Sequence, residues 1–147
     1  MRKRSNISAV QREVRKMFKI TPVQNIEEQR KYADECGIPC REGFFAYAML
    51  DTDTLELMGM AQFEIGESGG YITDLVPKID YDDFEAMFIL GRQTMNFIDL
   101  CGAHIVRASA ETTDEQLLRA IGFKKQESGE YFCNMDGMFD GSHCSHT

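Results

Sequence analysis

The side chains best suited to bind a metal lie near the end of the chain. His143, Cys144 and His146 fall within four consecutive positions. Thiolate and imidazole groups suit a tetrahedral zinc ion, with Cys133 or Asp140 as a fourth ligand. The spacing matches no zinc finger, and chain ends are commonly mobile. The sequence therefore leaves two interpretations of this segment, a zinc site and an unstructured polar tail.

Two carboxylates interrupt otherwise apolar runs. Glu64 lies in the run from Leu57 to Ile65, and Asp74 lies in the run from Tyr71 to Val76. Apolar surroundings disfavour the charged form of a carboxylate, and proteins use this effect to obtain a general acid or base. Each residue is therefore a candidate catalytic group, and the alternative is a carboxylate at a strand end or on a solvent-facing side.

The chain as a whole is acidic. Its 147 residues include 24 acidic and 16 basic side chains, which gives a formal net charge of -8. This charge disfavours generic nucleic-acid binding and favours cationic partners. The longest apolar run, Phe44 to Leu50, is far shorter than the roughly 20 residues that a membrane helix needs. We expect one globular domain with neither a nucleic-acid nor a membrane partner.

The charge changes sign near the N-terminus. Residues 1–19 carry seven basic groups and one acidic group. We interpret residues 1–16 as a basic extension that is either solvated or docked on the acidic body. The alternatives are a short helix that pairs with another subunit or an acidic partner, and a gene start placed upstream of Met17.

The number of cysteines and the absence of an apolar signal segment indicate the cellular compartment. Five cysteines cannot all pair within one chain, and Gln11 to Lys16 occupies the place where the apolar part of a signal peptide would follow. We therefore expect reduced thiols in a cytoplasmic protein.

The periodicity of apolar residues predicts alternating strands and helices. Asn25 and Gly37 bracket a helix, and the spacing of apolar residues from Phe84 to Ile98 indicates one face of a longer helix. The predicted fold class is α/β (α+β), with a mixed, mostly antiparallel sheet of about seven strands and helices on both faces. Strands are expected over 17–22, 44–51, 57–65, 71–76, 104–109, 123–128 and 130–134, and helices over 26–36, 81–101 and 115–120.

This order of elements over residues 17–135 resembles the GNAT superfamily of acyltransferases. The best local match is Gln116–Phe123, similar to the family's short helix that closes with a Gly-Phe pair. The resemblance implies that strand 71–76 splays from strand 104–110 and that the pantetheine of acetyl-CoA lies in the gap. It also implies that Leu75 and Val76 contact the cofactor through backbone atoms, and that the start of the long helix holds the pyrophosphate. Residues 136–147 would form a C-terminal tail.

The sequence departs from the family pattern at two places. The loop into the long helix usually carries a basic residue or Gln and closely spaced glycines, whereas Lys78–Glu85 contains Asp80, Asp82, Asp83 and Glu85. These carboxylates would repel a pyrophosphate, or are ordinary first-turn acids of a helix. The position where the family often has a proton-donating Tyr is Leu118 here, so Tyr131 is the candidate replacement; the alternative is a core aromatic.

Two functions follow from the resemblance. The first is an N-acetyltransferase in which an amine attacks the thioester directly, with Asp74 or Glu64 as base and no cysteine nucleophile. Its acceptor would be an amine of a small molecule or a protein, and a homodimer is plausible because the last hairpin leaves an open sheet end near Tyr131. The second is a non-catalytic GNAT-like binding or regulatory module that has lost pyrophosphate binding.

Overall fold

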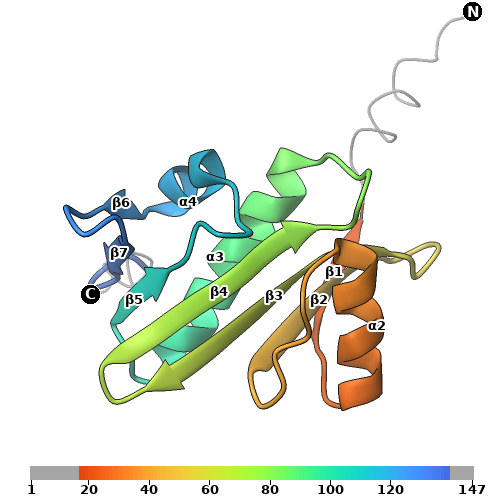
Figure 1. The fold of residues 1–147 in the computed structure, drawn as a ribbon, viewed down its shortest axis with the longest axis horizontal. Coiled ribbons are helices and arrows are strands. Elements are labelled where there is room, and N and C mark those ends of the chain that lie inside the picture. The colour runs from red at the N-terminus through yellow and green to blue at the C-terminus, as the bar shows by residue number, and fades with distance from the viewer. Residues whose placement is uncertain (1–16, 140–147) are drawn as a thin grey trace, which may run out of the picture.

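The computed structural model describes residues 17–139, which are organised around one seven-stranded sheet (Figure 1). Neighbouring strands are antiparallel except for one parallel pair, β4 and β5. The expected mixed, mostly antiparallel sheet is confirmed. In spatial order the strands are β1 (Phe18–Pro22), β2 (Phe45–Asp51), β3 (Leu57–Gly66), β4 (Gly69–Pro77), β5 (Ile105–Ala108), β7 (Tyr131–Asn134) and β6 (Lys124–Lys125).

Helices cover both faces of the sheet, as predicted. Alternate residues of a strand point to opposite faces, and β2 shows this directly. Ala46 and Ala48 belong to a buried cluster with residues of α2 (Ile26–Cys36), whereas Met49 belongs to the main core with residues of α3 (Phe84–Leu100) and α4 (Glu115–Ile121). None of the helices within residues 17–139 is long and apolar enough to span a bilayer.

Local capping explains where the helices begin and end. The Asn25 side chain accepts a hydrogen bond from the Glu28 backbone N–H (2.7 Å), and Gly37 ends α2 with φ of 72°, as the sequence predicts. Helix α3 begins at Phe84 rather than at Tyr81. Asp83 is its N-cap, because the Asp83 carboxylate accepts a hydrogen bond from the Ala86 N–H (3.0 Å).

The last hairpin is shorter than predicted. Strand β6 contains two residues instead of the six expected over 123–128. The Gln126 N–H bonds to the Glu130 carbonyl (2.8 Å), and the Gly129 N–H bonds to the Gln126 carbonyl (2.8 Å), so a turn replaces the rest of the strand. Local hydrogen bonding therefore overrides the strand pattern here.

The two glycines of β3 differ in how closely they are packed, and this predicts different effects of Ala. A Cβ at Gly59 would lie 2.8 Å from the Val76 carbonyl oxygen and 2.8 Å from Met87 Sδ, whereas a Cβ at Gly66 would meet no atom within 4 Å. We expect Gly59→Ala to lower the free energy of unfolding by about 1–3 kcal/mol, because the backbone of β4 must move. Gly66→Ala should change it by less than about 0.5 kcal/mol. Urea denaturation of both variants tests this, and equal midpoints would contradict the close packing at Gly59.

Candidate functional site

Strands β4 and β5 separate part of the way along their length (Figure 1). They pair only at Gly70, Tyr71 and Ile72, and the Ser109 N–H makes the last link to the Ile72 carbonyl (3.0 Å). The register of β3 against β4 shifts at the same point, because Thr73 is an extra residue in β4. Beyond this bulge β4 continues along β3 alone. The splay expected from the sequence is confirmed.

Threonine hydroxyls take the place of β5 along the free edge of β4. The Leu75 N–H donates to Thr113 Oγ1 (3.0 Å), and Thr113 is 3% exposed. The neighbouring Thr112 hydroxyl donates to Asp74 Oδ1 (2.7 Å). The amide of Leu75, an expected cofactor contact, is therefore held by an internal hydroxyl. The residue that caps α4 is the next one along the chain, Asp114.

Asp74 is completely buried, but its surroundings are polar. Arg41 approaches it with two nitrogens, Nε at 2.9 Å from Oδ2 and Nη2 at 3.1 Å from Oδ1. Gln62 Nε2 donates to Oδ2 (2.9 Å), so together with Thr112 each carboxylate oxygen accepts two hydrogen bonds. The bond to Asp74 raises the pKa of Arg41 above its usual value. The expectation of apolar surroundings for Asp74 is wrong, because its partners come from distant segments.

Glu64 and Tyr131 occupy contrasting environments. Glu64 is exposed on β3, opposite Tyr71 of β4 and on the same face as Gln62. Tyr131 is 0% exposed, and its hydroxyl has no hydrogen-bond partner in the part of the chain that the structure describes. Burial raises the pKa of Tyr131, an effect that the nearby Arg119 guanidinium opposes. Such a phenol stays protonated at neutral pH, as a proton donor must.

A pocket of about 150 Å³ lies in the gap, where β4 ends and both α3 and α4 begin. Its walls combine apolar side chains with three carboxylates. The Asp83 carboxylate bonds to the Ala86 N–H (3.0 Å), and the Asp114 carboxylate bonds to the Gln116 N–H (3.2 Å). The acidic loop noted in the sequence therefore lies at the pocket. The lining residues are Leu75, Pro77, Asp82, Asp83, Phe84, Met87, Thr112, Asp114 and Leu117.

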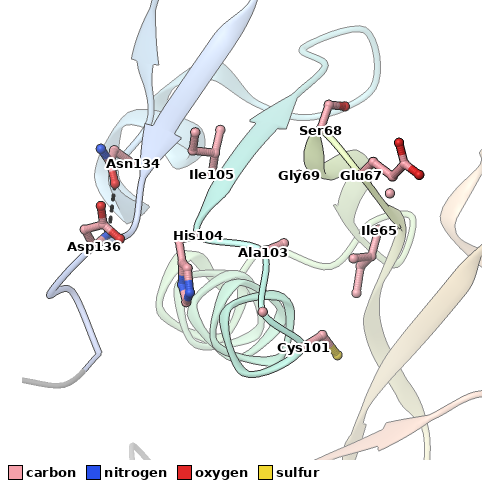
Figure 2. Close-up of a pocket in the computed structure, with 12 residues that line it drawn as sticks. Ile65, Glu67, Ser68, Gly69, Cys101, Ala103, His104, Ile105, Asn134 and Asp136 are labelled. Atoms are coloured by element: carbon pink, nitrogen blue, oxygen red, sulfur yellow. Dashed lines mark hydrogen bonds between the residues drawn. The ribbon is translucent and has the colours of Figure 1, made fainter.

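A second pocket, of about 400 Å³, lies at the other end of β4 (Figure 2). Asn134, Asp136 and His104 lie on one side of it, and Ile65 and Glu67 lie on the other. The Asp136 N–H donates to Asn134 Oδ1 (2.9 Å). None of the predicted site residues lines this pocket.

The described cysteines and histidines form no metal site. Within residues 17–139 no group of three or more His, Cys, Asp or Glu side chains is placed to hold a metal ion. His143, Cys144 and His146, with Asp140, lie outside the described residues. Burial raises the pKa of Cys36 to about 12, and burial also raises the pKa of Cys133, so neither thiol forms the reactive thiolate at neutral pH.

Comparison with known proteins identifies the fold. No protein-family model matches the sequence, and no curated protein matches it. Tetrahymena GCN5 matches with a TM-score of 0.64 and 8% identity, covering 80% of this chain and 96% of that one. A chain of the KacTA–DNA complex matches with a TM-score of 0.63 and 12% identity, covering 87% and 99%. The PaiA N-acetyltransferase of Thermoplasma acidophilum, in complex with coenzyme A, matches with a TM-score of 0.58 and 13% identity, covering 79% and 96%.

The residues described therefore have the fold of the GNAT acetyltransferase superfamily. The fold class predicted from the order of elements is confirmed. At identities this low the similarity establishes the fold alone, and the chemistry of this chain depends on the residues in the gap.

Removing the cation from the ion pair at Asp74 should cost far more stability than removing the cation from an exposed pair. Arg41→Met leaves a carboxylate buried without its cation, for which we expect a loss of about 3–5 kcal/mol in the free energy of unfolding. The matched control is Arg30→Met, because the side chains of Arg30 and Glu42 are 55% and 65% exposed. Its loss should be much smaller, because water and salt screen an exposed pair. Urea denaturation compares them, and similar losses would contradict a structural role for the Arg41–Asp74 pair.

The Thr113 hydroxyl should stabilise the free edge of β4. Thr113→Val leaves the buried Leu75 N–H without an acceptor, and we expect a loss of about 1–3 kcal/mol in the free energy of unfolding. Thr54→Val is the control, because the Thr54 hydroxyl accepts from the Glu56 N–H (3.1 Å) at an exposed turn, where water can replace it. If chemical denaturation gives both variants the same midpoint, Thr113 does not hold the edge.

Proposed function

We propose that this protein is an N-acetyltransferase that transfers an acyl group from a thioester such as acetyl-CoA to an amine acceptor. The observation that supports this most directly is the separation of β4 from β5, with a pocket beyond it where β4 ends and α3 and α4 begin. The similar PaiA structure is an N-acetyltransferase in complex with coenzyme A.

The residues of the gap fit one part of coenzyme A. Leu75, Met87 and Leu117 provide an apolar wall for a pantetheine arm. The oxygen of Thr113, 3.0 Å from the Leu75 nitrogen, occupies the place that a carbonyl oxygen of the arm or of the thioester would take. Leu75 and Val76 would thus hold the arm, after Thr113 has turned away. The cofactor would supply the activated acyl group.

The proton transfers are assigned to residues of β3, β4 and β7. The attacking amine must lose a proton, and Glu64 is exposed on the face where Gln62 and Asp74 also lie. Asp74 is a weaker candidate for direct contact, since four hydrogen bonds already occupy its oxygens. Tyr131 is the candidate donor to the departing thiolate, although it does not line the pocket. The Leu75 N–H would stabilise the negative charge that develops on the carbonyl oxygen.

The net charge indicates the acceptor substrate, and the cysteine content indicates the cellular compartment. A net charge of -8 favours a cationic amine, either a small molecule or a lysine of a protein. One similar structure is a complex that contains DNA, but for this chain the acidic charge argues against nucleic acid. We propose a cytoplasmic protein, with a homodimer as its expected assembly.

A second candidate is a binding or regulatory module that keeps the fold without the reaction. Two observations favour it: the Leu75 N–H is occupied by Thr113, and three carboxylates line the pocket. A module of this kind would bind a ligand in the gap without turnover.

Thermal melting with a thioester and a turnover assay separate the two candidates. We expect 1 mM acetyl-CoA or S-acetylpantetheine to raise the melting temperature, because a ligand selective for the folded state stabilises it. With polyamines and lysine peptides as acceptors, thiol release should accompany acetylation. A shift without turnover supports the module, and no shift with either thioester contradicts both assignments of the gap.

The catalytic assignment has a matched control within the same hairpin. Glu64→Gln should lower kcat about 100-fold or more if Glu64 is the general base. Glu67→Gln removes the same charge from the β3–β4 turn and should leave kcat unchanged. Equal rates for the two variants would exclude Glu64 as the base.

A further inference from the structure

The residues at the start of α3 do not fit the diphosphate of coenzyme A. Asp82, Asp83 and Asp114 all line the pocket in the gap, and no lysine or arginine does so among residues 17–139. A diphosphate there would face carboxylates at close range without a compensating cation. At about 4 Å in water-like surroundings, each such contact lowers affinity about fivefold.

At the start of each helix, one amide that could bind an anion is already occupied by a carboxylate of the chain itself. A helix N-terminus attracts phosphate because its first N–H groups lack partners within the helix. In α3 the Ala86 N–H bonds to the Asp83 carboxylate (3.0 Å), and in α4 the Gln116 N–H bonds to the Asp114 carboxylate (3.2 Å). Both helices that border the pocket therefore carry an internal anion of their own.

Apart from Thr112, the remaining walls of the pocket are apolar. Leu75, Pro77, Met87 and Leu117 line it. The Leu75 N–H, which bonds to Thr113 in this structure, is the polar group that an amide or thioester carbonyl would need. A neutral arm on this surface carries no charge that the carboxylates of the pocket would repel. The pocket therefore discriminates between the two parts of coenzyme A, because it accommodates the arm and repels the diphosphate.

We infer that this pocket selects an acyl donor of the pantetheine-thioester class that presents no diphosphate at the start of α3, with Asp82 and Asp114 as the residues that determine this specificity. The inference rests on the proposed function, because it names the donor of the same site. Added salt should therefore strengthen the binding of a donor that carries a diphosphate, because screening relieves its repulsion by the carboxylates. Salt would weaken the binding if the protein attracted the diphosphate.

Isothermal titration calorimetry on the full chain tests the inference with two probes, S-acetylpantetheine and acetyl-CoA, at 50 and 300 mM NaCl. We expect S-acetylpantetheine to bind at least 10-fold more tightly than acetyl-CoA, with an affinity that salt leaves unchanged. The affinity for acetyl-CoA should rise with salt. The opposite order of affinities, or an acetyl-CoA affinity that falls with salt, would overturn the inference and leave the proposed function standing.

A double variant and a matched control locate the effect. Asp82→Asn with Asp114→Asn should strengthen acetyl-CoA binding about 25-fold and leave S-acetylpantetheine within about twofold. Asn is as good an N-cap as Asp, so α4 keeps its start. The control, Glu67→Gln with Asp136→Asn, changes the net charge equally at the opposite end of β4 and should have no effect. Equal effects of both double variants would overturn the inference, and binding of neither thioester would overturn the proposed function together with it.

Discussion

The candidate site depends on one interruption in the hydrogen-bond ladder of the sheet. Thr73 adds a residue to β4, and from this point β4 remains paired with β3 but leaves β5. A strand edge inside a protein must find other partners, because an unpaired buried N–H or C=O group is costly. Here the segment before α4 supplies them, with Thr113 bonded to the Leu75 N–H. The gap exists because this segment, rather than β5, satisfies the edge.

A buried polar network fixes β3 and β4 on the face of the sheet that α2 covers. Gln62 accepts hydrogen bonds from Gln29 of α2 (2.8 Å) and from the Arg41 N–H (2.9 Å), and it donates to Asp74 (2.9 Å). The network joins α2, the loop before β2, and strands β3 and β4 at one point. Because each buried group has a partner, the loop that carries Arg41 is fixed relative to β4. With the bonds from Arg41 and Thr112, both oxygens of the Asp74 carboxylate are occupied by hydrogen bonds.

The charge of the site and the fold of the chain point to different ligands. The fold is shared with a coenzyme A complex, yet the start of α3 carries carboxylates where an anion would bind. Capping explains part of this arrangement, because Asp83 and Asp114 each satisfy a helix amide. Asp82 caps neither helix, so helix stability does not explain its carboxylate at the pocket. A role in selecting the charge of the ligand does explain it.

The sequence by itself determined the local interactions of this protein. Asn25 and Gly37 define α2 through contacts within a few residues, and the order of strands and helices predicted the sheet. The parting of β4 from β5 was implied by the resemblance of this order to the GNAT superfamily. The surroundings of Asp74 could not be predicted in this way, since Arg41 is 33 positions distant, and neither could the contact between Leu75 and Thr113, which spans 38 positions. Only the tertiary structure decides such pairings, because the partner of a buried polar group depends on which distant segments the fold brings together.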